Sequence, residues 1–179
     1  MDEKAKWEEF TKLSTRMEIE YAKTVSPIIW HQIAMYWVRD FPRDFIDWLV
    51  VNPNTSPATA LMIYWKLGSS YLKKYKDRKE VLKQIPIFIT EYDLSRFIEN
   101  KYLEGFYKGN QIIFDPNQPD EDDVIWAQEY ENIEDVRGIP AVMYEKTKGI
   151  EVLPPLDFIE GLPLELFCEI RFLMDRLGV

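Results

Sequence analysis

Cysteine, histidine and glycine are scarce in this chain, and each scarcity argues against a class of protein. The 179 residues include one cysteine, Cys168, so no disulfide forms within the chain, and its apolar helical surroundings predict a buried, reduced thiol. Seven glycines argue against an all-β fold with many glycine-marked hairpins. No run approaches the roughly 18 apolar residues of a membrane span, and the charged stretch MDEKAKWEEFTK lacks the apolar core of a signal peptide. We therefore expect a soluble cytoplasmic protein.

The motifs of common enzyme classes are missing as well. His31 is the only histidine, and no second histidine or cysteine stands nearby to complete a zinc site. The chain contains no G-x-S-x-G nucleophile turn and no glycine-rich phosphate loop. The basic cluster at 73–79 is interleaved with tyrosines and acids, so it is better explained as a favourable helix end than as a nucleic-acid site. We predict no catalytic constellation, no cofactor and no metal.

Apolar, aromatic and acidic residues are abundant. Hydrophobic residues make up 46% of the chain and aromatic residues 15%, enough for a sizeable core with rings left for a contact surface. The formal net charge is −9. Such a chain is repelled by nucleic acids and anionic membranes and attracted to basic partners. This balance favours a protein partner over nucleic acid or membrane, and it leaves the oligomeric state open.

Apolar periodicity and helix caps predict a mainly α protein. Ser56 followed by Pro57, and Asp77 followed by Glu80, are typical helix starts. Short turns between the segments favour antiparallel helical hairpins, arranged as a bundle or as a short α-solenoid-like stack. The expected helices cover residues 2–23, 27–40, 42 to about 51, 57–75, 78–84, 87–104 and 163–177.

The last third is less regular. Turn signals at Gly109-Asn110 and Asp115-Pro116-Asn117 flank QIIF (111–114), a candidate short β element, and 124–130 is a candidate short helix. We predict a single domain, 1–179, made of a helical body 1–107, an irregular segment 108–162 and a closing helix 163–177.

The acidic segment, residues 115–135, is the main candidate for a partner surface. A calcium loop is not favoured, because Pro119 takes a ligand position and no glycine follows at the sixth. A solvated loop is the simplest interpretation. Charge density with aromatic anchors also suits docking of a basic protein. The candidate contact residues are Asp120, Glu121, Asp122, Asp123, Trp126, Glu129, Tyr130, Glu131, Glu134 and Asp135.

A second candidate is an aromatic pocket around His31, Trp37 and Trp65 that would hold a small ligand. A histidine inside an apolar helix is more often a hydrogen-bonded structural residue, and the tryptophan spacing is typical of a core. The pocket is therefore the alternative to a structural role for these side chains.

Three strings in the chain resemble one family. HQIAMYW (31–37), DWLVVNPNTSPATALMIYW (47–65) and ENKYLEGFYKGNQIIFDPNQ (99–118) are similar to the bacterial family named domain of unknown function 4274. The likeness covers about half of the chain. Members usually carry Asn-Trp-Asp-Asp-Gly after the first helix, where this chain has VRDFPRD. The resemblance supplies no catalytic residues.

The resemblance implies a small cytoplasmic protein of the kind often encoded beside secreted toxins. We therefore expect an immunity protein that binds and neutralises a cognate toxin, which would be a basic toxin domain. The alternatives are a helical scaffold protein without a toxin partner and a small-ligand binder with the pocket near His31.

Overall fold

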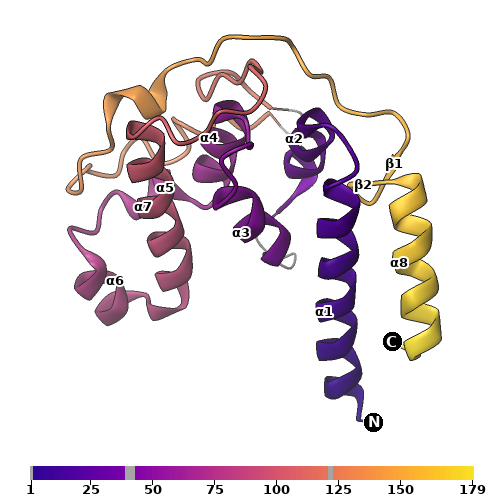
Figure 1. Ribbon diagram of the computed structural model, residues 1–179. Helices are drawn as coiled ribbons and strands as arrows, with labels where there is room; N and C mark the ends of the chain where they lie inside the picture. Colours follow the sequence, from indigo (N-terminus) through magenta and orange to yellow (C-terminus); the bar gives the residue numbers. More distant parts are fainter. Residues whose placement is uncertain (1, 39–42, 121–122) are drawn as a thin grey trace. The chain divides into compact units, whose positions relative to one another are not determined.

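The computed structural model describes residues 2–38, 43–120 and 123–179. In this part of the chain, eight α-helices, two 3-10 helices and one two-stranded sheet form the fold (Figure 1). The prediction of a mainly α protein is confirmed. Backbone contacts define a terminal unit, Met1–Val51 with Val152–Val179, and a central unit, Asn52–Glu151. The organisation of 1–179 as one domain stays a prediction.

An antiparallel pair of long helices builds the terminal unit. α1 (Glu3–Ala22) and α8 (Leu164–Leu177) lie side by side (Figure 1). Lys6 near the start of α1 donates a hydrogen bond to the carbonyl of Gly178 after the end of α8, over 3.3 Å. Tyr21 near the end of α1 is hydrogen-bonded to Glu165 at the start of α8. Contacts at both ends fix the antiparallel direction.

Two shorter helices and a β-hairpin complete the terminal unit. α2 (Pro27–Tyr36) is tied to α1 by Trp30, whose indole N–H donates to the carbonyl of Ala22 over 2.8 Å. The edge of that ring meets Trp48 of α3 (Asp44–Val50) at 5.1 Å between centroids. The hairpin pairs β1 (Phe158–Ile159) with β2 (Leu162–Pro163). These contacts bring segments from both ends of the chain into one unit.

The central unit is organised around α4 (Pro57–Lys66), in which every residue from Ala58 to Trp65 is buried. α7 (Ile89–Leu103) packs against it, with Tyr64 of α4 bonded to Glu99, and the later Ser69 is bonded to Ser95 of α7. α6 (Arg78–Gln84) and the 3-10 helix η1 (Pro86–Phe88) pack on α7. The remaining elements are α5 (Ser69–Leu72) and the 3-10 helix η2 (Ala141–Tyr144).

Both predicted helix starts are confirmed. The Ser56 side chain accepts a hydrogen bond from the amide of Ala58, and Asp77 accepts one from the amide of Glu80. The prediction of one continuous helix over 57–75 is wrong. Gly68 adopts a left-handed conformation with φ 79° and separates α4 from α5.

Other local predictions need correction. The segment 124–130 forms hydrogen-bonded turns in place of a helix, with the amide of Gln128 donating to the carbonyl of Ile125. QIIF contributes a single parallel bridge, Ile112 to Ile150, and the paired strands lie later, in β1 and β2. Cys168 is exposed on α8, because the buried face of that helix carries Leu166 and Leu173. No helix in the described residues combines the length and hydropathy that a membrane crossing requires.

Candidate functional site

Two of the predicted contact carboxylates are used by the fold itself. Asp120 accepts hydrogen bonds from the amide of Val124 at 3.0 Å and from the indole N–H of Trp126 at 2.8 Å. Asp135 accepts from the amides of Gly138 and Ile139 at 2.7 and 3.0 Å. These side chains close turns of the acidic segment, so their removal would change its shape as well as its charge.

The other described carboxylates among the predicted contact residues face solvent. Glu121 and Asp122 lie outside the described residues. Asp123 is exposed and has φ 59°, a left-handed conformation that Asp and Asn tolerate better than most residues. The remaining exposed carboxylates are Glu129, Glu131 and Glu134. With Asp135, which is exposed as well as hydrogen-bonded, the structure places five candidate contact carboxylates on the surface of the central unit.

Tyr130 is the exposed aromatic residue among these carboxylates. It is 40% exposed, and its ring meets Tyr71 edge-on at 5.4 Å between centroids. The Lys74 ammonium lies 3.9 Å from the centroid of the Tyr71 ring, and a hydrogen bond with Lys74 lowers the pKa of Tyr71. Trp126 is half-buried, and its indole N–H is already bonded to Asp120. Tyr130 is consequently better placed than Trp126 to anchor a partner.

The three residues of the predicted aromatic pocket are divided between the two units. His31, 2% exposed in α2, and Trp37, at the end of that helix, are buried in the terminal unit. Trp65 is fully buried in the central unit, where its indole N–H donates to the carbonyl of Met143 over 3.0 Å and its ring meets Tyr144. Trp65 thus has a structural role, and the small-ligand pocket stays a prediction.

A buried ionic cluster in the central unit is the least expected feature of the structure. Glu99 of α7 is 1% exposed at its side chain and Arg137 2%. One oxygen of Glu99, Oε1, accepts from Arg137 Nη2 at 2.7 Å and from the Tyr64 hydroxyl at 2.6 Å. The other, Oε2, is paired with Arg96. Burial raises the pKa of Tyr64 well above its ordinary value, so the hydroxyl stays a donor to the carboxylate.

Arg137 reaches this cluster from the chain that follows the acidic segment. Its Nη2 also donates to the Tyr64 hydroxyl at 2.9 Å, and its guanidinium carbon lies 5.9 Å from the centroid of the Tyr92 ring. Its Nε and Nη1 have no hydrogen-bond acceptor among the described residues. Within the described residues, Nη2 therefore makes the hydrogen bonds of the Arg137 side chain.

The sequence carries little signal for this cluster. Glu99 follows Tyr92 and Ser95 at steps of seven and four, and these residues are the buried face of α7 together with Ile98. Glutamate is seldom fully buried, so a glutamate on this face is not expected from the sequence. Its partner Arg137 lies 38 positions later in the chain, well beyond the end of α7. No local sequence pattern connects the two residues.

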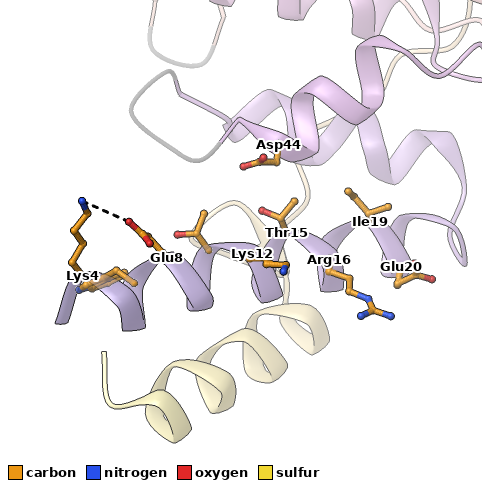
Figure 2. A pocket seen from close by; sticks show the side chains of 10 residues that line it. Lys4, Glu8, Lys12, Thr15, Arg16, Ile19, Glu20 and Asp44 are labelled. Carbon is orange, nitrogen blue, oxygen red and sulfur yellow. Dashed lines mark ion pairs between the residues drawn. The ribbon is translucent and has the colours of Figure 1, made fainter. Parts of the chain in front are cut away.

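A separate groove of about 730 Å³ lies in the terminal unit. Residues of α1 line it, with Asp44 of α3 on the facing side (Figure 2). Trp7, 50% exposed, is the largest apolar side chain among the lining residues, and Lys4, also in the lining, pairs with Glu8 over 3.8 Å. Charges of both signs border the groove, so its lining favours no single class of ligand.

Comparison with family models gives a match in the first part of the chain. Residues 25–103 match the family model described as Domain of unknown function (DUF4274). The predicted resemblance is confirmed over about half of the chain. No curated protein and no solved structure matches significantly. Tyr64 and Glu99 lie inside the DUF4274 segment, whereas Arg137 and the exposed carboxylates of the acidic segment lie outside it.

Proposed function

We propose that this protein is an immunity protein, a cytoplasmic inhibitor that binds and neutralises a basic toxin domain. The observation that carries the proposal is the exposed Tyr130 in a segment whose exposed side chains include four carboxylates. Aromatic anchors supply buried contact area at low entropic cost, and charged residues around them set specificity and association rate. The net charge of −9 adds long-range attraction for a basic partner.

The proposed contact surface consists of Tyr130 and the carboxylates Asp123, Glu129, Glu131 and Glu134. Asp120 and Asp135 close turns of the segment that carries this surface, because their oxygens accept hydrogen bonds from backbone amides or from Trp126. The ring of Tyr71 contacts the ring of Tyr130 edge-on and restricts its movement. A braced ring loses less freedom on binding than a mobile one, which favours its use as an anchor.

The experiment is capture of the partner from the host with tagged protein, at low and then moderate salt, followed by mass spectrometry. A surface variant, Asp123→Asn with Glu131→Gln and Glu134→Gln, removes three exposed carboxylates without touching the turn-forming ones. A control variant, Glu9→Gln with Glu151→Gln and Glu169→Gln, makes the same change in net charge at exposed sites elsewhere.

The proposal predicts one basic partner, recovered in near-equal amount by the wild type and the control variant and depleted with the surface variant. The captured protein should show toxicity that the wild type relieves. A partner that both variants recover equally would remove the acidic segment as the contact surface. Recovery of no stoichiometric partner at low salt would favour the scaffold alternative.

A further inference from the structure

We propose that the Arg137–Glu99 ion pair is a clasp that holds the acidic segment on the helices of the central unit and opens independently of them. The role of the acidic segment in binding a partner rests on the proposed function. The ion pair and its opening are properties of the free protein and do not depend on it.

Arg137 connects the end of the acidic segment to the helices. The amide of Arg137 donates to the carbonyl of Lys73 over 2.9 Å, and its side chain bonds Glu99 and Tyr64. The preceding residues, 124–136, form turns and bends with mainly exposed side chains. Within this stretch, Tyr130 meets Tyr71 and Trp126 lies near Lys66, so the buried ion pair of Arg137 is the charged contact that holds its end.

The cluster is asymmetric in a way that makes one variant informative. Without Arg137, the buried carboxylate of Glu99 keeps Arg96 and the Tyr64 hydroxyl. Without Glu99, Arg137 would be a buried charge with no carboxylate partner, which is strongly destabilising. Arg137→Met keeps most of the aliphatic stem and therefore tests the clasp with the least damage to the helices.

Arg137→Lys gives the rescue. In the wild type only Nη2 is hydrogen-bonded within the cluster, and Nε and Nη1 have no acceptor among the described residues. A lysine ammonium can supply that one point of contact, and it removes two buried donors that have no acceptor. The conservative variant should hence retain the clasp, although arginine and lysine usually differ at buried ion pairs.

The test is hydrogen–deuterium exchange of the free full chain, read by mass spectrometry. Reporters are the amide of residue 137, which donates to the carbonyl of Lys73, and the turn amides of the segment, Gln128, Glu131, Ile133 and Gly138, whose acceptors lie within the segment. In Arg137→Met these amides should exchange on the order of a hundredfold faster, while α4 and α7 stay within about threefold of the wild type. In Arg137→Lys these amides should exchange within about tenfold of the wild-type rate. Lys148→Met removes an exposed charge from the same unit, and its exchange should match that of the wild type.

Equal acceleration in α4, α7 and the segment would overturn the proposal, because the pair would then be part of one cooperative core. Unchanged exchange of the segment in Arg137→Met would overturn it too, and so would a failure of Arg137→Lys to restore protection. None of these measurements involves a partner, so they can refute the clasp while the proposed inhibitor function stands. The capture experiment can likewise refute the inhibitor function while the clasp stands.

Discussion

Glu18 should make the stability of the protein fall as pH rises from about 4.5 to about 7. Burial in α1 raises the pKa of Glu18 from its ordinary value of 4.5 to about 7, and the nearby charge of Asp44 adds to the effect. The folded state therefore binds the proton more tightly than the unfolded chain. Between the two pKa values the folded protein carries more protons, so the free energy of unfolding decreases with increasing pH.

The size of this effect follows from the two pKa values. At about 1.4 kcal/mol for each pKa unit, the difference between 4.5 and about 7 sets a ceiling of about 3 kcal/mol. Glu18 keeps some contact with solvent, so about 1 to 3 kcal/mol is expected. Glu18→Gln, which imitates the protonated carboxyl, should match the wild type near pH 4 and exceed it by this amount at pH 8.

Urea denaturation at intervals between pH 4 and pH 8, followed by circular dichroism, measures the difference between the two proteins. The contributions of other titrating groups cancel in that difference. Glu9→Gln is the matched control, because Glu9 is an exposed carboxylate on the same helix. A Glu18→Gln advantage that does not change with pH, or that is largest at pH 4, would refute the argument.

Two further predictions concern the central unit. Tyr64→Phe should lower the free energy of unfolding by about 2 to 3 kcal/mol in the same assay, because the hydroxyl that donates to buried Glu99 over 2.6 Å is lost. A gain in stability would show that this hydroxyl is not needed there. Gly109→Ala should cost about 2 kcal/mol or more, because its Cβ would lie 2.0 Å from the carbonyl oxygen of Asn54. Gly105→Ala should cost only about 1 kcal/mol, since its φ of 64° is strained but the space is open, and a reversed order would contradict the reasoning.

The helical part of the fold was predictable where local chemistry dictates it. Ser56 before Pro57 and Asp77 before Glu80 mark helix starts that the structure confirms with hydrogen bonds to the first-turn amides. Gly68 was harder, because the apolar spacing continues across it although its backbone is left-handed. Apolar periodicity indicates which side chains face the core. A single left-handed residue can interrupt the helix without changing that spacing.

The candidate site was predictable only in its exposed part. Charge and aromatic content identify the acidic segment, but they do not separate Asp120, which closes a turn, from Glu131, which faces solvent. The buried Glu99–Arg137 pair depends on a contact between distant segments. No local propensity encodes such a contact, which is decided by tertiary packing.

The proposed function requires the exposed carboxylates of the acidic segment to steer a basic toxin onto this protein. The most direct measurement is the association rate of the captured partner with the wild type, the surface variant and the control variant over a series of salt concentrations. The account predicts about tenfold slower association and a flatter salt dependence for the surface variant at low salt, with the control close to the wild type. Equal rates and equal salt dependence for the two variants would contradict it.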